Sequence, residues 1–363
     1  MTGPAQADWA ARVEREYQNL RAAFSWSVSG EHTVTAGRLC LGLWRYWRGG
    51  GHLREGRDWL SHVLAAPGEL GDALHARVLH AAAVLAAGQD EHETAYRLGN
   101  ESRRRAEAAG DRPVTAQAHN ALGIAAIGGG DYRQATAHFE ESLAIWRELG
   151  QPSGTAIALG NLTKVALRLG DVAAADRYCE QCLALERAAG NTRGVMLSLG
   201  CLGQIRLAQG DVPAARAALE ESVALGRTLG DLFGEATALH TLAQAARSEG
   251  DAVGALRLLA GALARRHEIG DREDLANSLD SVADLMSTGD PALAARLLGA
   301  ARGLRDRYRL PVPPETADQL DRTFAAVRSA LPGDDFGTQW AAGRSAPLDL
   351  IVDQVLDLVP SVD

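Results

Sequence analysis

His240 and Asp280 are the two residues of this sequence that could carry out acid–base chemistry together. They lie 40 positions apart, and a histidine beside a carboxylate can move a proton to or from a bound molecule that both reach. Asp284 follows Asp280 at the i, i+4 spacing of one helix face, so proximity would raise the pKa of one carboxyl. Any polar helix surface supplies such pairs. We therefore expect a non-catalytic protein and keep His240 and Asp280 as acid–base candidates in case it is an enzyme.

Patterns of nucleophilic catalysis and metal binding are missing from the sequence. It contains neither the G-x-S-x-G turn of serine hydrolases nor the H-E-x-x-H pair of zinc enzymes. His75 and His80 are five residues apart, about 140° round a helix, so they would not share a face. Cys179 and Cys182 form a C-x-x-C without a second pair, and we interpret them as small apolar residues within a helix. We therefore expect no metal and no cofactor.

Regularly spaced glycines predict the elements that position these residues. Gly-Asp recurs every 40 residues, at 130–131, 170–171, 210–211 and 250–251, and a second glycine series at 110, 150, 190, 230 and 270 lies 20 residues out of phase. Glycine suits the left-handed position after a helix, and the aspartate that follows it can cap the next helix. Apolar residues between the glycines follow i, i+3, i+4, i+7 spacing, so each repeat contains two amphipathic helices. One pair cannot bury its apolar face alone, so the repeats must stack as a solenoid.

The period divides the chain into a capped stack. We expect an N-terminal capping helix in 1–30, seven 40-residue repeats in 31–310 and a C-terminal helical cap in 311–363. The repeats, numbered one to seven below, are 31–70, 71–110, 111–150, 151–190, 191–230, 231–270 and 271–310. A small residue lets helices cross closely, and alanine begins the second helix of four repeats, at Ala135, Ala175, Ala215 and Ala255.

The repeat resembles the 40-residue variant of the tetratricopeptide repeat (TPR), although Leu and Ala replace the Trp and Tyr that mark the 34-residue form. AxxxxEESLAIWRELG, which ends at Gly150, recurs as AxxxLEESVALGRTLG, which ends at Gly230. His119 stands where the neighbouring repeats have leucine, so we expect a buried, hydrogen-bonded histidine there. The resemblance implies an all-α fold, a right-handed superhelical solenoid of TPR-like helix pairs with helical caps.

Both ends of the chain resemble the ends of a helical region in larger bacterial proteins. EREYQNLRAAFSW near the N-terminus and AARLLGAARGLRDRYRLPVPP near the C-terminus are similar to the TPR sensor region of STAND-type signal-transduction ATPases and LuxR-type transcriptional regulators. There the region is held to sense inducers or partner proteins. This sequence has no G-x-x-x-x-G-K-[ST] loop, and its one lysine, Lys164, lies in TKVALRLG, so ATP hydrolysis of that type is excluded. With no convincing helix-turn-helix after residue 345, the resemblance implies the sensor region without ATPase and DNA-binding domains.

Charge and hydropathy exclude several classes of partner. The net charge is −9 and no basic run stands out, so we expect no direct contact with nucleic acid. No apolar stretch is long enough for a membrane span, which needs about 18 residues. The N-terminus lacks the basic and apolar regions of a signal peptide, and four cysteines in this length are typical of a reducing compartment. The sequence thus predicts a cytoplasmic protein, and the resemblance implies a bacterial one.

The first helix of each pair lines the concave face in TPR stacks, which indicates where a ligand would lie. Matching that pattern to the repeats turns the seventh, tenth, fourteenth and seventeenth positions inward. The polar residues at these positions are Arg77, His80, Gln117, Asn120, Lys164, Gln204, Thr237, His240, Gln244, Arg247, Asn277, Asp280 and Asp284. In repeat one Trp44, Trp47 and Arg48 would lie nearby, with the rings either a platform for a ligand or packed under the N-terminal helix. The groove would be aromatic and basic at one end and acidic at the other.

Three hypotheses about function remain open. The leading one is a non-catalytic sensor or adaptor whose concave groove binds a peptide, partner protein or small molecule in bacterial regulation, acting through a partner protein. The second is a cofactor-free enzyme, or a small-molecule-binding accessory of a biosynthetic pathway, that uses the tryptophans of repeat one with His80, His240 and Asp280. A dead-end pocket would favour the second hypothesis, and an open groove the first. The third is a purely structural oligomerisation module, such as a homodimer, in which the groove holds the amphipathic segment 347–358 of another copy.

Overall fold

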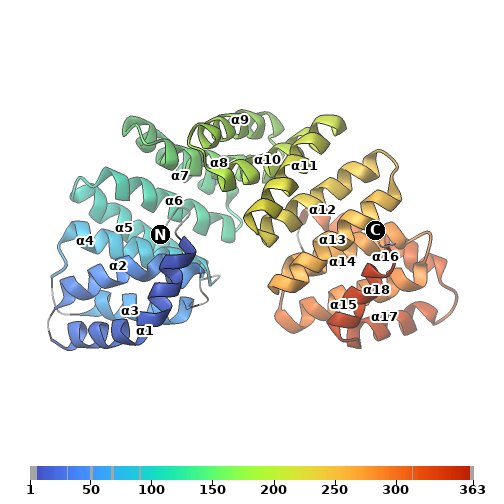
Figure 1. The fold of residues 1–363 in the computed structure, drawn as a ribbon, viewed down its shortest axis with the longest axis horizontal. Coiled ribbons are helices and arrows are strands. Elements are labelled where there is room, and N and C mark those ends of the chain that lie inside the picture. The colour runs from blue at the N-terminus through green and yellow to red at the C-terminus, as the bar shows by residue number, and fades with distance from the viewer. Residues whose placement is uncertain are drawn as a thin grey trace. The chain divides into compact units, whose positions relative to one another are not determined.

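The computed structural model describes residues 6–30, 32–49, 52–66, 69–89, 91–312 and 314–359 (Figure 1). All helices and strands found in these ranges are α-helices, which confirms the all-α prediction. Those up to residue 188 are α1 (Gln6–Ser29), α2 (Thr33–Gly49), α3 (Leu53–Ala65), α4 (Asp72–Ala87), α5 (His92–Ala108), α6 (Arg112–Gly128), α7 (Tyr132–Glu148), α8 (Pro152–Arg168) and α9 (Val172–Ala188). The later ones are α10 (Thr192–Ala208), α11 (Val212–Leu229), α12 (Leu232–Ser248), α13 (Ala252–Ile269), α14 (Arg272–Met286), α15 (Pro291–Tyr308), α16 (Pro314–Ala330), α17 (Asp335–Ser345) and α18 (Leu348–Leu356).

Two helices fall in each 40-residue interval, from α2 and α3 in repeat one to α14 and α15 in repeat seven. The first helices of repeats two to seven are therefore α4, α6, α8, α10, α12 and α14. The chain forms two compact units, Met1–Leu185 and Glu186–Asp363, which are called the N-terminal unit and the C-terminal unit below. In the part of the chain that the structure describes, no helix combines the length and the apolar character that crossing a membrane requires.

The repeated Gly-Asp loops have the conformation that their sequence predicts. Gly130 has φ 78°, in the left-handed region that glycine adopts at little cost. The side chain of Asp131 then accepts a hydrogen bond from the backbone N–H of Gln134 at 2.9 Å and caps α7. Left-handed glycines recur at 110, 150, 170, 190, 210, 230, 250 and 270. Local chemistry therefore ends one helix and starts the next along most of the stack.

A second repeated contact joins the two helices of a repeat. A hydroxyl or thiol of the second helix donates a hydrogen bond to a backbone carbonyl of the first, 26 residues earlier. The pairs are Ser102–Ala76 (2.8 Å), Ser142–Ala116 (2.9 Å), Cys182–Ala156 (3.3 Å) and Ser222–Met196 (2.9 Å). Cys182 thus takes the place of serine as a small donor, and Cys179 is buried in the same helix. Both cysteines thus lie buried in α9, as expected for residues within a helix, but Cys182 acts there as a hydrogen-bond donor and not as an apolar residue.

α1 packs on α2 and α3 at the beginning of the N-terminal unit. Trp47 of α2 donates its indole N–H to the hydroxyl of Tyr17 on α1 at 2.8 Å. The Trp47 ring also lies against Gly56 of α3, where an added Cβ would overlap it. Trp59 meets the same ring edge-on, with centroids 5.3 Å apart. An aromatic cluster under α1 therefore closes this end of the stack.

α17 crosses α15 very closely in the C-terminal unit. Three glycines leave the contact without side chains, Gly299 and Gly303 on α15 and Gly343 on α17. A Cβ at any of them would meet the backbone of the opposite helix. Because the two helix backbones are in direct contact there, close packing holds α17 on α15.

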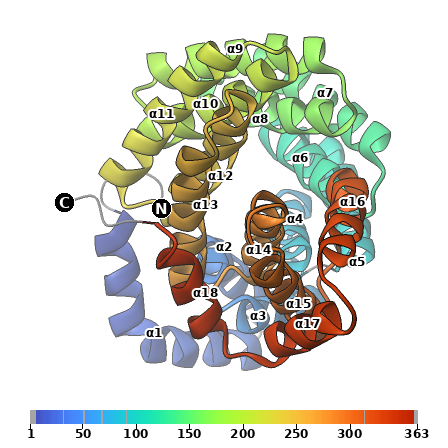
Figure 2. The same cartoon turned by 90° about the vertical axis from the view of Figure 1, so that its right-hand side faces the viewer.

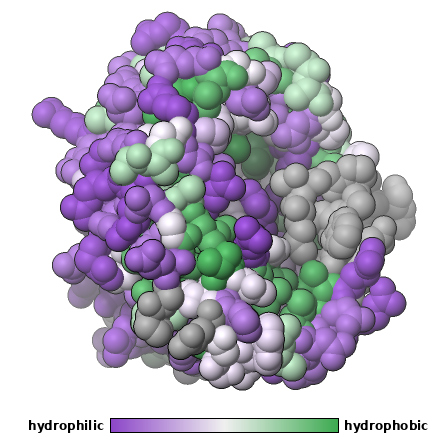
Figure 3. Space-filling model, turned by 90° about the vertical axis from the view of Figure 1, so that its left-hand side faces the viewer, coloured by the Kyte–Doolittle hydropathy of each residue, from purple (hydrophilic) through white to green (hydrophobic). Residues whose placement is uncertain are grey.

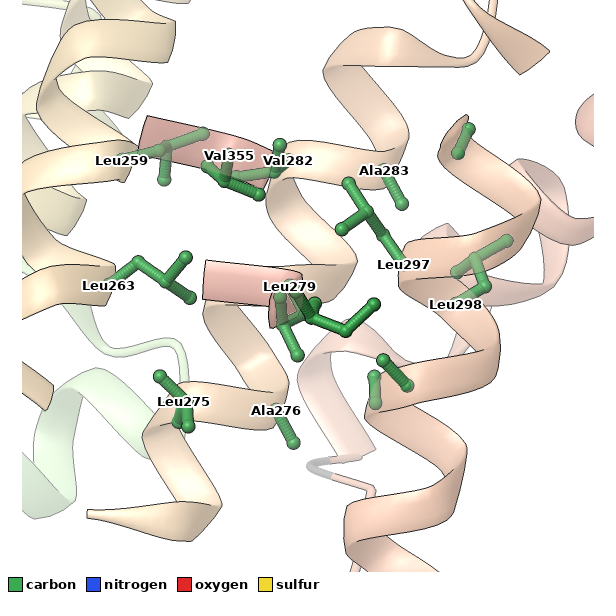
Figure 4. Close-up of a cluster of buried hydrophobic side chains, with 14 of the residues drawn as sticks. Leu259, Leu263, Leu275, Ala276, Leu279, Val282, Ala283, Leu297, Leu298 and Val355 are labelled. Atoms are coloured by element: carbon green, nitrogen blue, oxygen red, sulfur yellow. The ribbon is translucent and has the colours of Figure 1, made fainter. Parts of the chain in front are cut away.

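α18 returns to the repeats and packs on α13 and α15 (Figure 2). Figure 4 shows Val355 of α18 between Leu259 of α13 and Val282 of α14, and all three are at most 2% exposed. The terminal helix therefore covers apolar surface of its own chain. Residues 347–358 would have to leave this position to fill the groove of another copy.

Candidate functional site

The first helices expose one face, which in the N-terminal unit belongs to α4, α6 and α8. Lys164 of α8 is exposed and has no ion-pair or hydrogen-bond partner among the described residues. About one turn before it, Asn161 donates a hydrogen bond to the side-chain oxygen of Asn120 on α6 at 2.7 Å. A further turn back, Ile157 is 56% exposed. We call the surface formed by Arg77, Asn120, Ile157, Asn161 and Lys164 the first-helix face.

Charge is distributed unevenly between the first and second helices. α6, α8 and α10 contain no aspartate or glutamate, whereas α7, α9 and α11 each contain at least two. The basic residues of those first helices are Arg112, Lys164, Arg168, Arg193 and Arg206. Although the chain is acidic overall, no carboxylate of α6 or α8 therefore competes for Lys164, which can attract an anionic group.

The remaining predicted groove residues differ in how accessible they are. Arg77 is exposed and pairs with Asp111 across the repeat boundary, with N and O atoms 2.7 Å apart. Gln204 of α10 and Gln244 of α12 are exposed in the C-terminal unit. The surface shown in Figure 3 is mainly hydrophilic, with hydrophobic residues in small separate patches.

Exposed apolar residues also occupy inward positions and were missed by the sequence prediction. Ile157 and Leu197 are at the seventh positions of repeats four and five and are 56% and 42% exposed. Phe233 of α12 is 51% exposed, one turn before Thr237 of the predicted groove. Ile157 and Leu197 were not predicted because only polar side chains were assigned to the groove, although an apolar residue at an inward position was a usable signal.

Trp44 and Trp47 do not form a ligand platform, which corrects the groove predicted for repeat one. Trp47 has no exposed surface and Trp44 is 9% exposed, so a ligand cannot lie across either ring. Trp44 instead meets the buried ring of His80 edge-on, with centroids 5.8 Å apart. The physical reason is α1, whose aromatic residues belong to the same buried cluster. The side chain of Arg48 lies outside the described residues.

α16 covers the predicted acidic end of the groove in repeat seven. Asp284 of α14 accepts hydrogen bonds from Arg247 at 2.6 Å, from the Thr323 hydroxyl at 2.6 Å and from Gln319 at 2.9 Å. Burial acts to raise the pKa of Asp284, but these hydrogen bonds together lower it. The prediction of an open acidic end is therefore wrong, because the carboxylate of Asp284 is already bound by Arg247 and by two side chains of α16.

His240 and Asp280 have separate partners, so the predicted acid–base pair is not assembled. His240 Nδ1 lies 3.2 Å from a guanidinium nitrogen of Arg266 on α13, and burial together with that charge lowers the pKa of His240 to about 4. Asp280 accepts a hydrogen bond from Arg305 on α15 at 2.6 Å. Burial raises the pKa of Asp280 and Arg305 offsets part of that rise, without a contribution from Asp284. Sequence reasoning considered first helices only and missed both arginines.

His119 and His138 meet between α6 and α7. Their Nδ1 atoms are 3.2 Å apart, and the Tyr96 hydroxyl lies 3.5 Å from Nε2 of His138. Burial, followed by the charge of His138, lowers the pKa of His119 to about 4. Burial and then Arg103 lower the pKa of His138. The hydrogen bond predicted for His119 is confirmed, although its side chain is partly exposed.

A broad open depression that the sequence did not predict lies between the second helices α5 and α7. Its volume is about 1000 Å³, and its lining includes Glu93, Arg97, Asn100 and Gln134. Charges of both signs line it, so it favours no single class of ligand. Among the described residues, no group of three or more His, Cys, Asp or Glu could hold a metal ion.

Comparisons with known proteins identify the repeats. Two family models described as tetratricopeptide repeat match residues 74–148 and 158–192. A protein of Mycobacterium tuberculosis named as an HTH-type transcriptional regulator is 29% identical over 143 residues, which are 39% of this chain and 13% of that protein. The chain therefore corresponds to a small part of the length of this curated relative.

Solved structures share the fold at low sequence identity. A Rap protein complexed with Competence and Sporulation Factor has a TM-score of 0.64 at 12% identity and covers 94% of this chain and 99% of its own. The Rap conjugation gene regulator of plasmid pLS20, in complex with the Phr* peptide, has a TM-score of 0.50 at 10% identity, with 82% and 96% covered. A STAND protein with a TPR sensor from Pyrococcus horikoshii has a TM-score of 0.56 at 14% identity, with 94% and 55% covered. Residues 74–148 and 158–192 therefore match tetratricopeptide repeats, and the predicted resemblance to the TPR region of STAND-type proteins is confirmed at the level of the fold.

Proposed function

We propose that this protein is a non-catalytic sensor or adaptor that holds an acidic peptide segment of a partner on its first-helix face. The observation that carries the proposal is the arrangement of Asn120, Ile157, Asn161 and Lys164 on α6 and α8. It combines two amides joined across a repeat boundary, an exposed apolar side chain and an exposed cation. An extended peptide uses each of these, since its backbone needs hydrogen bonds, its side chains need apolar contacts and its carboxylates need a cation.

The electrostatics of the first helices favour an acidic ligand. No carboxylate is present on α6 or α8 to compete for Lys164. A cation without a competing carboxylate attracts anionic segments and repels basic ones. Because each repeat contacts only its neighbours, a peptide that bridges α6 and α8 would alter how these repeats sit on each other. That change would be the signal passed to a partner protein.

Regulation in bacteria is the setting that we propose for this binding. The two Rap structures, one with a bound factor and one with a bound peptide, support a peptide ligand by their shared fold. The name of the mycobacterial relative supports a regulatory role. None of the four cysteines forms a disulfide, which supports a reducing cytoplasm.

Lys164 is the only lysine of the chain, so amine-reactive labelling reports directly on the first-helix face. The chain would be acetylated with a succinimidyl ester in two separate reactions. One contains a pool of hexapeptides with two acidic residues each, and the other contains a pool with two basic residues each. Mass spectrometry of the Lys164 peptide gives the labelling rate. When acidic peptides occupy two thirds of the sites, we expect labelling of Lys164 to slow about threefold. The basic pool should leave the labelling rate unchanged.

Two charge-removing variants separate the face from general electrostatics. Lys164→Gln should weaken binding of an acidic peptide selected from the pool about fivefold, which corresponds to ~1 kcal/mol. Arg147→Gln removes the same charge from the exposed surface of α7, and we expect an unchanged affinity. Equal protection by both pools, or an unchanged affinity in Lys164→Gln, would contradict the proposal.

A further inference from the structure

Gly160 lies in the interior of α8, in the middle of the first-helix face. Ile157 is three residues before it and Lys164 four residues after it, so all three share one side of the helix. Asn161 follows Gly160 directly, and Asn120 of α6 occupies the equivalent position of repeat three. Gly160 alone among these five residues has no side chain, so a ligand can come closest to the helix there.

Packing within the protein does not require this glycine. Beyond its own helix backbone and its chain neighbours, a Cβ added at Gly160 would meet one atom within 4 Å, the Sγ of Cys182 at the ordinary contact distance of 3.8 Å. Gly123 of α6 differs, because a Cβ there would lie 2.5 Å from the ring of Phe139. Glycine destabilises a helix interior relative to alanine. An alanine would therefore fit at position 160 and stabilise α8.

The asparagines around Gly160 each keep one polar group for a ligand. The hydrogen bond between them uses an amide N–H of Asn161 and the side-chain oxygen of Asn120. Asn120 Nδ2, a donor, and Asn161 Oδ1, an acceptor, have no hydrogen-bond partner among the described residues, and neither atom is buried. The main chain of one ligand residue offers the matching pair, a carbonyl that accepts from Asn120 and an N–H that donates to Asn161.

We propose that Gly160 sets how closely the main chain of the bound peptide approaches α8. This inference rests on the proposed function, because it concerns the ligand of the first-helix face. Without a side chain at position 160, an extended segment can lie against the helix within reach of Asn120 and Asn161. Ile157 and Lys164, about one turn to either side, contact side chains of the neighbouring ligand residues. The residue over Gly160 is thus recognised through its main chain, and its neighbours through their side chains.

Gly160→Ala separates this role from a role in packing. The variant adds one methyl group at the contact and should weaken binding of an acidic peptide selected from the pool about fivefold, measured by fluorescence anisotropy. Because alanine favours the helix, the melting temperature should rise by about 1–2 °C. Gly42→Ala is the matched control, since Gly42 of α2 is exposed and nothing lies within 4 Å of an added Cβ. It should raise the melting temperature similarly and leave the affinity unchanged.

Backbone methylation of the peptide tests the main-chain contact. Each backbone N–H of the selected peptide would be replaced in turn by an N-methyl group. We expect methylation at one position to weaken binding to the unaltered chain about tenfold, because it removes the donor to Asn161 and adds bulk over Gly160. In Gly160→Ala the same methylation should weaken binding only about twofold, since the close contact has already been lost.

Three results would overturn the inference. They are undiminished binding to Gly160→Ala, a lowered melting temperature of that variant, and a peptide that tolerates methylation at every backbone N–H. If Lys164→Gln still weakens binding in any of these cases, the proposed function stands and only the role of Gly160 fails. If no acidic peptide slows labelling of Lys164, the proposed function itself fails, and the inference fails with it.

Discussion

At the residue scale, His119 and His138 show how one repeat departs from its neighbours. Leucine takes the place of His119 in the repeats on either side, at Leu79, Leu159, Leu199 and Leu239. In repeat three a hydrogen bond between two rings replaces the apolar contact. Burial disfavours a charge on either ring, so both are neutral in the folded state near neutral pH. The stability of the N-terminal unit should therefore depend on pH.

The direction of that pH dependence follows from the pKa of His119, which is about 4 in the folded chain and about 6.5 in an unfolded one. Between these values the unfolded state binds more protons than the folded state. The contribution of the neutral ring is therefore fully present above about pH 6.5 and is lost as the pH falls toward about 4. The lowered pKa of His240 acts in the same direction. We expect the melting temperature to fall between about pH 7 and about pH 5, measured by circular dichroism.

A double variant isolates the histidine pair. His119→Leu with His138→Leu replaces both rings with apolar side chains and also removes the contact of the Tyr96 hydroxyl with His138. We expect a weaker pH dependence and a melting temperature at about pH 5 that is higher by about 2–4 °C, or ~1 kcal/mol. His62→Gln changes an exposed histidine and should leave the pH dependence as it is. An unaltered slope in the double variant would exclude the pair as its source.

At the element scale, the crossing of α15 and α17 depends on residues without side chains. An added Cβ at Gly299 would overlap the backbone carbonyl of Trp340, so the two helices would have to separate. We expect Gly299→Ala to lower the free energy of unfolding by about 1–3 kcal/mol, measured by urea denaturation. Gly337 lies in α17 with nothing within 4 Å of an added Cβ. Gly337→Ala should therefore be neutral or stabilise by up to about 1 kcal/mol, and equal losses in both variants would refute the close crossing.

At the scale of the whole molecule, a solenoid needs its ends covered because each repeat contacts only its neighbours. Ile351, Val352 and Val355 of α18 are buried on the C-terminal unit. A chain that stops after residue 346 would lose this cover, and we expect a loss of about 4 kcal/mol or more from three buried aliphatic side chains. Hydrogen exchange should accelerate in α13, α14 and α15 and stay unchanged in α4, α6 and α8. Unchanged exchange in α13 would contradict the cap.

Much of the architecture could be predicted because the signals that produce it are local. A glycine such as Gly130 ends a helix through its own φ angle, and Asp131 starts the next through a hydrogen bond three residues away. Two helices per 40-residue interval follow from these short-range effects. The apolar periodicity between them requires stacking, because one pair exposes a face that must be buried.

The candidate site depended on contacts between distant segments, which only the tertiary structure decided. Trp47 leaves the predicted groove because α1 packs over it, and Asp284 leaves it because α16 donates hydrogen bonds to it. The partner of Asp280 escaped prediction for a simpler reason. Arg305 lies on α15, a second helix, and the prediction considered first helices only. The sequence by itself determined the helix pairs through local backbone chemistry. Which inward residues stay exposed was decided by the packing of the terminal helices, since contacts between distant segments have no periodic signal.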